Sequence, residues 1–509
     1  MYFARSFFAY MALWFLLVAC RSSNKNNSIS FSILQINDVY EISPISNGKY
    51  GGLARIATLK KQLLAENPNT IAVLSGDFLS PSMLGNVEIN GKKLRGKQMI
   101  AALNAAGIDL VTFGNHEFDL NQEDLLERIQ ESDFQWMSTN TFRQYGDSAR
   151  SDIRPFQDKN GVDFPTHYLW KVSSLDQKKA FKLAFLGVTL PFTKKPHVHY
   201  DDYFEATSKE LKKLEGKTDV VLALTHLNAQ DDRAYARAFP IIPLLMGGHD
   251  HSAMELIEGN TRIVKADANA KTAYVHRCVY HLGSKKLDVI SQKVVIGTRL
   301  AEDPAAMRKI NYWKQLADSA LRSQGFVPDE FLCQIKTPLE AQEVLVRSSQ
   351  TNSAQLIMRA MEANMPPSDL IILGGGAIRL DDVLHESITQ YDVLRLLPFG
   401  GAFLRVHLKG SLLEQILNDG EKNSGTGGYL QRRYAEYTGD SWKIRGKALN
   451  PTKTYTLVIN DYLMTGQEKR LGYLTPQNKD VVRIDPIQPS HKDIRKTLIA
   501  YLRKIKIVD

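Results

Sequence analysis

The stretch Phe113-Gly114-Asn115-His116-Glu117-Phe118-Asp119 decides how the rest of the chain is interpreted. It follows the apolar run 109–113, which predicts a buried strand, and Gly114 permits a sharp turn where that strand ends. An amide, an imidazole and a carboxylate then occur close together. Such groups are typical of a site at the carboxyl edge of an open α/β sheet. The stretch therefore predicts an α/β fold with a functional site at this edge.

Four other apolar runs also end in polar residues. A lone Gly-Asp is usually a turn and a lone His at a strand end is usually structural, but five such endings in one chain are hard to produce by chance. Carboxylate, amide and imidazole groups at one sheet edge suit one or two divalent transition metals, and two metals about 3.5–4 Å apart activate a hydroxide for in-line displacement at phosphorus. The four endings are Asn37-Asp38, Ser75-Gly76-Asp77, Thr225-His226 and Gly248-His249-Asp250-His251.

The length and composition indicate a globular protein of two domains. A chain of 509 residues exceeds one ordinary hydrophobic core, and its 43% apolar and 23% charged residues are typical of folded proteins. The net charge of +9 is spread along the chain. A nucleic-acid binder would need a concentrated basic stripe, so no nucleic-acid partner is expected. The polar segment 302–323 predicts a helix that connects the two domains.

The first twenty residues predict export. Arg5 precedes the apolar run 7–19, which is short and N-terminal as in a secretory signal. Leu17-Val18-Ala19-Cys20 resembles the bacterial lipobox, and this resemblance implies that Cys20 is lipidated and that residues 21–30 form a polar tether. A simple signal anchor is the alternative. The expectation is an exported lipoprotein of the bacterial cell envelope, facing the periplasm or the exterior.

Some other residues with reactive or chelating side chains are expected to be structural. Cys278 and Cys333 can form one pair at most, and nothing in their surroundings indicates an activated thiolate, so buried and inert thiols are expected. His197-Val198-His199 has a chelating spacing, but it lies in a loop rich in lysine and proline. The polar segment from about 141 to 179 is expected to be an irregular excursion.

Together, the strand-end motifs resemble those of the calcineurin-like metallophosphoesterases, and within them the 5′-nucleotidase family of bacterial periplasmic nucleotidases, UDP-sugar hydrolases and animal ecto-5′-nucleotidase. Gly51-Gly52-Leu53-Ala54-Arg55 also matches that family. The resemblance covers nearly all the mature chain. It implies an α/β protein with a four-layer αββα metallophosphoesterase sandwich over residues 31–300, a linker helix over 301–325, and a C-terminal α/β nucleotide-binding domain over 326–509.

The resemblance also implies a role for each polar residue of the N-terminal domain. Asp77 would bridge two metals, Asp38 and His251 would bind the first, and the second would be bound by Asn115, His226 and His249. His116 would contact the phosphoryl group, and Asp119 would orient it.

One position departs from the family, which usually has a histidine ligand where this chain has Tyr40. Tyr40 either binds a harder metal such as ferric iron as a tyrosinate, or does not bind and leaves a weaker first site. The expected cofactors are therefore two divalent ions of Mn, Zn, Mg or Co, with Fe included if Tyr40 is a ligand.

The C-terminal domain carries the motifs that imply a nucleoside. Gly374-Gly375-Gly376-Ala377-Ile378-Arg379 resembles the family's Gly-Gly-Gly-Ile-Arg, in which the arginine contacts substrate. Tyr429 and Tyr462 lie in stretches that resemble those of two aromatic residues stacking on the base. Glu468 stands where the family has an aspartate that holds the ribose hydroxyls. Each tyrosine is equally compatible with a half-buried strand aromatic.

The resemblance thus implies metal-dependent hydrolysis of nucleoside 5′-monophosphates to nucleoside and phosphate by a hydroxide that two metals activate, assisted by His116 and Asp119. Two alternatives stay open. One is a phosphatase or phosphodiesterase for another phosphoester, such as 2′,3′-cyclic nucleotides or sugar-nucleotides. The other is a nucleotide-binding lipoprotein without catalysis, which Tyr40 alone favours.

Overall fold

The computed structural model describes residues 27–146, 152–192 and 194–508. The predicted signal peptide 1–20, with Cys20, and most of the tether 21–30 lie outside the described residues. Two compact units are present. The first contains residues up to 81 together with 95–313, and the second contains 82–94 together with the chain from 314 onward. Helix α7 (Pro304–Ser323) contains the point of division.

The first unit is built on two six-stranded sheets. One has the order β17 (Lys286–Val295), β16 (Thr272–His281), β1 (Ser28–Ile36), β2 (Thr70–Ser75), β5 (Leu110–Thr112) and β6 (Gln135–Trp136). The other has the order β14 (Met254–Glu258), β15 (Thr261–Lys265), β13 (Leu244–Gly247), β12 (Val220–His226), β10 (Ala180–Thr189) and β9 (Tyr168–Ser173). β1, β2, β5 and β6 run parallel, as do β10, β12, β13 and β15. The carboxyl ends of each parallel set therefore share one edge.

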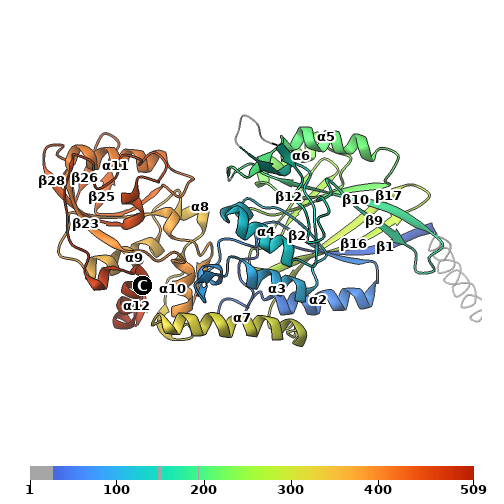
Figure 1. Cartoon of the computed structure of the whole chain (residues 1–509), viewed down its shortest axis with the longest axis horizontal. Coiled ribbons are helices and arrows are strands. Elements are labelled where there is room, and N and C mark those ends of the chain that lie inside the picture. The colour runs from blue at the N-terminus through green and yellow to red at the C-terminus, as the bar shows by residue number, and fades with distance from the viewer. Residues whose placement is uncertain (1–26, 147–151, 193, 509) are drawn as a thin grey trace, which may run out of the picture. The chain divides into compact units, whose positions relative to one another are not determined.

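The two sheets form the middle of a four-layer sandwich. Their facing sides make one buried core, to which β1 and β2 contribute Ile33 and Val73, and β10 and β12 contribute Phe185 and Leu222. In Figure 1, helices α2 (Leu53–Glu66), α3 (Lys97–Ala106) and α4 (Gln122–Glu131) lie on one side of the strands, and α5 (Tyr203–Leu214) and α6 (Ala229–Ala238) lie on the other. The predicted αββα fold is confirmed.

Local sequence explains where several elements begin and end. α3 stops at Gly107, whose φ of 74° is left-handed, a conformation that glycine adopts without a steric penalty. α4 begins after Asn121, whose side chain accepts a hydrogen bond from the Asp124 N–H. β13 begins at Leu244, directly after Pro243, because proline has no N–H to contribute to a sheet.

The segment from 141 to 179 is not irregular throughout, contrary to expectation. It supplies β9 at the edge of the second sheet, where it pairs antiparallel with β10. It also supplies β7 (Thr141–Tyr145) and β8 (Asp152–Arg154), which form a three-stranded sheet with β11 (Val198–Tyr200). Only one residue of β7 and one of β9 are buried, so these strands lack the continuous apolar runs that identify the central parallel strands.

The second unit has its own sheet and core. A five-stranded sheet has the order β24 (Leu430–Arg433), β20 (Leu370–Gly374), β28 (Thr454–Asn460), β23 (Phe403–Lys409) and β29 (Val481–Ile484). Its core includes Ile372, Val406 and Leu457 from the strands and Leu413 and Ile416 from helix α11. The longer helices are α9 (Asn352–Ala363), α10 (Gln390–Leu396), α11 (Gly410–Lys422) and α12 (Ile494–Ile505). The expected C-terminal α/β domain is confirmed.

Shorter elements complete this unit. They are β3 (Glu88–Ile89), β4 (Lys92–Lys93), β18 (Phe331–Ile335), β19 (Leu339–Glu340), α8 (Glu343–Val346), β21 (Val383–Leu384), β22 (Ser387–Thr389), β25 (Ala435–Tyr437), β26 (Trp442–Ile444), β27 (Lys447–Ala448) and β30 (Ile507–Val508).

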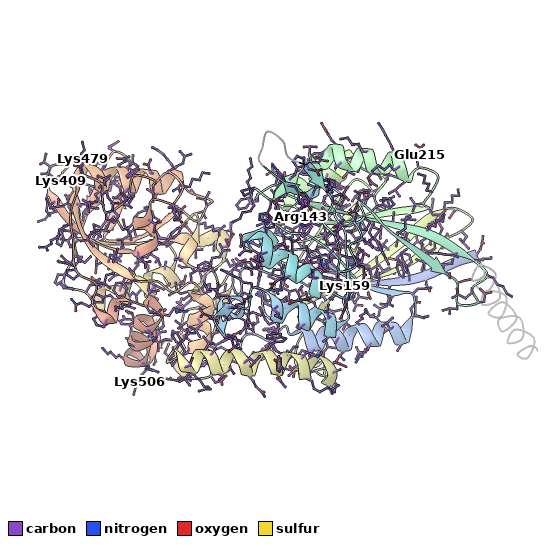
Figure 2. The ribbon with its side chains drawn as sticks, in the orientation of Figure 1. Arg143, Lys159, Glu215, Lys409, Lys479 and Lys506 are labelled. Carbon is purple, nitrogen blue, oxygen red and sulfur yellow. The ribbon has the colours of Figure 1, made fainter. Side chains whose placement is uncertain are left out.

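Charged side chains differ sharply in their surroundings. Glu215, Lys409, Lys479 and Lys506 are exposed and extend from the surfaces of their own units (Figure 2). A second group of charged side chains is fully buried at the carboxyl ends of the parallel strands in the first unit. Across the part of the chain that the structure describes, no helix is long and apolar enough to span a membrane.

Candidate metal centre

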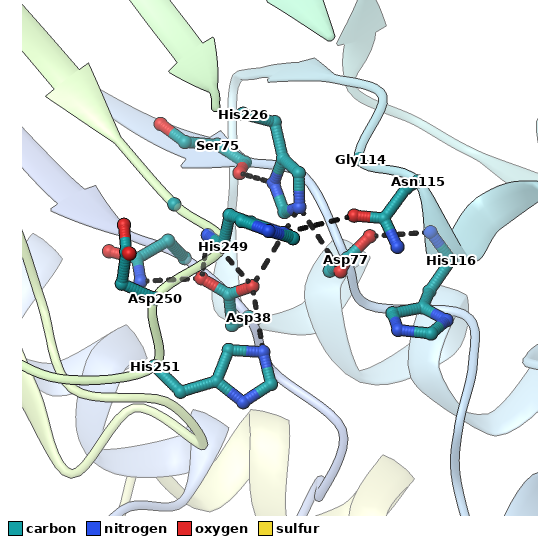
Figure 3. A network of polar contacts seen from close by, with 12 residues as sticks. Asp38, Ser75, Asp77, Gly114, Asn115, His116, His226, His249, Asp250 and His251 are labelled. Atoms are coloured by element: carbon teal, nitrogen blue, oxygen red, sulfur yellow. Dashed lines mark hydrogen bonds and ion pairs between the residues drawn. The ribbon is translucent and has the colours of Figure 1, made fainter. Parts of the chain in front are cut away.

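The predicted ligands come together where the parallel strands of the two sheets end. Asp38 follows β1, Asp77 follows β2, and Asn115 follows β5; from the second sheet, His226 ends β12, and His249 and His251 follow β13. Their side chains point toward one another (Figure 3). Asp38, Asp77, Asn115 and His226 are fully buried, so their polar atoms are withdrawn from bulk water.

Two groups of these residues have the composition and spacing of metal sites. One contains Asp77, His226 and His249, and the other contains Asp38, Asp77 and His251. Within each group the candidate ligand atoms all lie within 4.8 Å of one another. Because Asp77 belongs to both groups, its two carboxylate oxygens can serve two neighbouring cations. Imidazole and carboxylate donors suit divalent transition metals.

Three short contacts link the two sheets at this edge. His226 Nε2 lies 3.1 Å from Asp77 Oδ2, and His251 Nε2 lies 3.3 Å from Asp38 Oδ1. His249 Nδ1 lies 3.2 Å from Asn115 Oδ1. Each contact joins atoms that can bind a metal, so a cation placed among them meets donors from both sheets.

The tautomer of His226 is set by its second nitrogen. Nδ1 lies 2.8 Å from the carbonyl oxygen of Ser75, to which only a protonated nitrogen can donate. In the neutral ring, Nε2 then carries the lone pair and faces Asp77. Metal-binding histidines are commonly oriented by such a hydrogen bond.

The electrostatics of the centre also fit a cation. Burial raises the pKa of the Asp77 carboxyl, but nearby His226 and His116 outweigh it and hold that pKa well below its usual range. Burial lowers the pKa of His226, yet the Asp77 and Asp38 carboxylates raise it to about 10. Burial, with His226 beside it, lowers the pKa of His249 to about 4. The two buried carboxylates are thus stabilised by nearby positive charge. A proton on His226 supplies that charge here, and a bound metal ion would take the place of the proton.

Glycine permits the close approach of the β2 and β5 loops. A Cβ added to Gly114 would lie 2.1 Å from Asp77 Oδ1, and one added to Gly76, whose φ is +75°, would lie 2.4 Å from the Gly114 nitrogen. Neither position accepts a larger residue without moving the loops apart. The turns at Gly76-Asp77 and Gly114-Asn115 can therefore pack against each other only because each contains a glycine.

Glu117 holds these turns together, a role that the sequence did not reveal. Its Oε1 accepts hydrogen bonds from the N–H groups of Phe78 (2.8 Å) and Leu79 (3.1 Å), and its Oε2 accepts from those of Asp77 (2.9 Å) and Gly114 (2.6 Å). Burial and the Asp77 carboxylate raise the pKa of Glu117 to about 7, and the backbone donors oppose that shift. Four N–H donors need two oxygens that both accept hydrogen bonds, and the carboxylate form of Glu117 provides them.

His116 and Asp119 form a dyad at the margin of the centre. His116 Nδ1 lies 2.7 Å from Asp119 Oδ2, and the His116 N–H donates to Asp77 Oδ1 over 2.7 Å. The Ser80 hydroxyl donates to Asp119 Oδ2 over 2.9 Å, and the sequence did not single this residue out. Asp119 therefore fixes the imidazole while the backbone of His116 is tied to the proposed bridging residue.

Tyr40 lies within the centre. Its hydroxyl is 2.9 Å from His251 Nε2 and 3.3 Å from Asp77 Oδ2, and the residue is 6% exposed. The phenol oxygen thus stands among the proposed ligands of the first metal.

The second unit contains a pocket of about 600 Å³. Three of the predicted substrate residues line it, namely Arg379, Tyr462 and Glu468. Burial raises the pKa of Glu468, and burial followed by Glu468 raises that of Tyr462. Arg379 Nη1 lies 3.5 Å from Glu343 Oε2. An aromatic ring, a guanidinium and a carboxylate therefore share one cavity.

Tyr429 does not line this pocket. It is 4% exposed, and its hydroxyl accepts a hydrogen bond from Gln350 Nε2 over 3.0 Å. The aromatic residue that lines the pocket besides Tyr462 is Phe399, which is 60% exposed, and Arg347 lines it besides Arg379. Phe399 directly precedes Gly400-Gly401 in the sequence, and sequence reasoning assigned it no role.

The residues expected to be structural lie elsewhere. The expected loop is in part a strand, because His199 lies in β11 and His197, which is 9% exposed, directly precedes it. His199 Nε2 lies 3.0 Å from Asp201 Oδ1, and neither histidine belongs to the two candidate ligand groups. Cys278 and Cys333 are both buried and unpaired. Burial raises the pKa of Cys278 to about 12 and that of Cys333 to about 11, which matches the expected inert thiols.

Comparison with known proteins identifies both domains. Residues 31–253 match the profile of the calcineurin-like phosphoesterases, and residues 333–473 match that of the 5′-nucleotidase C-terminal domain. The first match contains all the proposed metal ligands, and the second contains the residues of the pocket.

Similar proteins extend over most of the chain. Protein UshA of Yersinia enterocolitica is 24% identical over 87% of this chain and 86% of its own length. The human 5′-nucleotidase is 26% identical over 78% of this chain and 69% of its own. The structure of a 5′-nucleotidase precursor from Thermus thermophilus shares the fold with a TM-score of 0.70 at 19% identity, covering 94% of this chain and 97% of that one. The chain therefore belongs to the 5′-nucleotidase family and is a phosphoesterase with a calcineurin-like metallophosphoesterase domain and a 5′-nucleotidase C-terminal domain.

Proposed function

We propose that this phosphoesterase hydrolyses nucleoside 5′-monophosphates to nucleoside and phosphate. The observation that carries the proposal is the chemistry of the pocket in the second unit. Phe399 and Tyr462 offer aromatic faces on which a base can stack, and Glu468 offers a carboxylate that can accept hydrogen bonds from ribose hydroxyls. Arg347 and Arg379 offer planar guanidinium donors that can hydrogen-bond to oxygens of the substrate. A nucleotide presents an aromatic base, ribose hydroxyls and further oxygens to these groups.

The residues of the first unit supply the hydrolytic chemistry. Asp77, His226 and His249 would hold one metal with Asn115, and Asp38, Asp77 and His251 would hold the other. Two bound divalent ions would contribute Lewis acidity toward a phosphoryl oxygen and would lower the pKa of a water molecule. The chain contributes the rigid placement of six ligands by strand ends, and it excludes bulk water from the fully buried carboxylates.

His116 supplies proton chemistry in this mechanism. Its Nδ1–H donates to Asp119, so Nε2 is the nitrogen left to face a substrate. The Asp119 carboxylate favours the imidazolium form, in which Nε2–H can donate to a phosphoryl oxygen or to the departing ribose oxygen. Ser80, through its hydrogen bond to Asp119, holds this carboxylate in position.

The proposal is tested by measuring hydrolysis: phosphate release for the monoesters, and chromatography of the products for cyclic nucleotides and UDP-sugars, whose diester hydrolysis releases no inorganic phosphate. The purified chain is assayed against 5′-monophosphates, 2′,3′-cyclic nucleotides, UDP-sugars and simple phosphomonoesters, with Mn, Zn, Mg, Co and Fe supplied separately. The expected result is highest kcat/KM on a nucleoside 5′-monophosphate. Preference for a cyclic nucleotide or sugar-nucleotide would favour the phosphodiesterase alternative, and nucleotide binding without turnover under every metal would favour a binding lipoprotein.

Phe399→Ala is expected to raise KM for nucleotides by about 5- to 150-fold, because stacking on one aromatic ring contributes about 1–3 kcal/mol. Turnover of p-nitrophenyl phosphate should change little, since that substrate has no base to place in the pocket. Steady-state kinetics on both substrates checks the prediction.

Tyr429→Phe is the matched control for that substitution. It removes only a hydroxyl that contacts Gln350 outside the pocket, so KM for nucleotides should stay at the wild-type value. A larger effect at Tyr429 than at Phe399 would contradict the assignment of the stacking ring.

Tyr40→Phe distinguishes the two interpretations of the first metal site. If the phenol oxygen binds iron, the iron-loaded protein has a visible charge-transfer band, and the substitution removes it while weakening iron binding. Absorption spectra of the iron-loaded wild type and variant check this. A colourless iron-loaded protein whose Tyr40→Phe form is fully active would exclude tyrosinate ligation.

We also propose that the chain is exported and tethered to a bacterial membrane by lipid on Cys20. The lipobox-like sequence before Cys20 supports this. The intact mass of the mature protein provides the test: the proposal requires a diacylglyceryl group on an N-terminal Cys20, and an unmodified Cys20 would refute it.

A further inference from the structure

A buried lysine lies directly behind the candidate metal centre. Lys265 ends β15, next to β13 in the second sheet, where it pairs with Gly247. Its side chain is 1% exposed. A lysine is almost never so buried without partners, because removing an ammonium group from water is costly. The partners of Lys265 therefore indicate its role.

The ammonium group contacts the chain on both sides of the histidine ligands. Lys265 Nζ donates to the carbonyl oxygen of Leu227 over 2.6 Å and to that of Gly248 over 2.8 Å. Leu227 directly follows the proposed ligand His226, and Gly248 directly precedes the proposed ligand His249. One cation therefore fixes the ends of β12 and β13 relative to each other.

Two carboxylates complete the surroundings of Lys265. Nζ lies 2.6 Å from Asp232 Oδ2, in helix α6, and it also pairs with Asp250. Asp250 stands between His249 and His251. Burial lowers the pKa of Lys265, but Asp232 and Asp250 raise it above its usual range, so the side chain is an ammonium ion.

The loop that Lys265 holds is in an unfavourable backbone conformation. His249 has a φ of 81° and His251 a φ of 58°, both in the left-handed region that non-glycine residues rarely adopt. Such conformations are energetically unfavourable and persist only where the surroundings impose them. Contacts to Gly248 and Asp250 on either side of His249 provide such a constraint.

We propose that Lys265 is a positioning residue that preassembles the histidine half of the metal centre by clamping the ends of β12 and β13. This rests on the proposed function only in that the centre binds metal. Lys265 is neither a proposed metal ligand nor a residue of the substrate pocket. Substituting it should therefore change the affinity for metal even when no substrate is present.

Lys265→Gln tests this by keeping a hydrogen-bond donor while removing the charge. Titration calorimetry with Mn²⁺ should show metal binding weakened by about 10- to 100-fold, the usual effect of losing a residue that orients metal ligands. Denaturant unfolding is measured on the same samples. A purely structural lysine would lower the unfolding midpoint and leave Mn²⁺ affinity in the folded protein unchanged.

Lys60→Gln is the matched control. Lys60, in helix α2, is 11% exposed and also pairs with an aspartate (Asp109, 2.7 Å) and a carbonyl oxygen (that of Gly107). Both partners precede β5, at the end of that strand opposite the centre. Its substitution should cost stability and leave Mn²⁺ affinity unchanged.

The double variant Lys265→Gln/Asp232→Asn keeps the test valid if the single variant does not fold, because it also removes a carboxylate that would be left unpaired. Wild-type Mn²⁺ affinity in a folded variant lacking Lys265 would overturn the inference. If the wild type itself bound no metal, the proposed function would fail instead, so the two failures are distinguishable.

Discussion

Asp77→Asn is expected to lower turnover by about 10³-fold or more, with loss of at least one bound metal. Asp77 is the carboxylate common to both candidate metal groups, and the substitution replaces one of its two anionic oxygens with an NH₂ group, which cannot bind a cation. Metal ions contribute several kcal/mol to such reactions, and each 1.36 kcal/mol corresponds to about tenfold in rate. Phosphate-release kinetics and elemental analysis of the dialysed variant measure the two effects.

The matched control is Asp219→Asn. Asp219 is an exposed carboxylate just before β12 that accepts the Lys182 N–H over 2.8 Å, at the opposite end of the strand from His226. Its variant should keep wild-type activity and metal content. An Asp77→Asn protein that retained two metals and normal turnover would refute the bridging role.

Glu117→Gln is expected to destabilise the first unit by about 2–5 kcal/mol. The amide nitrogen cannot accept hydrogen bonds, so two of the four buried N–H groups that face Glu117 lose their acceptor, at about 1–3 kcal/mol each. Removing a buried charge next to Asp77 offsets part of this cost. The cost of two unpaired N–H groups that face an NH₂ group is larger than this gain. Denaturant unfolding measures the change.

Glu258→Gln provides the comparison for Glu117. Glu258 is 20% exposed and pairs with Arg233 and Arg237 near the surface. Ion pairs near a protein surface contribute little to stability because water and salt screen them, so the free energy of unfolding of this variant should stay close to that of the wild type. Equal effects at the two glutamates would mean that the four backbone hydrogen bonds of Glu117 do not stabilise the fold.

Much of the metal centre could be predicted because its determinants are local. A buried parallel strand appears in the sequence as a continuous apolar run, and the polar residue that follows the run must lie at the carboxyl edge of the sheet. Asp38, Asp77, Asn115 and His226 each follow from this alone. The metallophosphoesterase and C-terminal α/β folds were predictable for the same reason, together with the family resemblance.

Three short strands and the pocket were less accessible to sequence reasoning. Few residues of β7, β8 and β9 are buried, so these strands lack the continuous apolar run of a buried strand and resemble an irregular polar segment. Tyr429 and Phe399 are both aromatic and both lie near glycines. Which of them lines the pocket depends on how distant segments pack around each ring, and Tyr429 is covered whereas Phe399 is 60% exposed.

The sequence alone determined which polar residues follow each buried strand, and hence which side chains are the candidate ligands. Only the tertiary structure decided what holds those ligands in place. Glu117 meets the backbone of a loop about 40 residues earlier in the chain, and Lys265 meets carbonyl oxygens 38 and 17 residues earlier. The physical reason is that a buried charge is stabilised by whichever backbone groups the fold brings to it, and no local pattern records those partners.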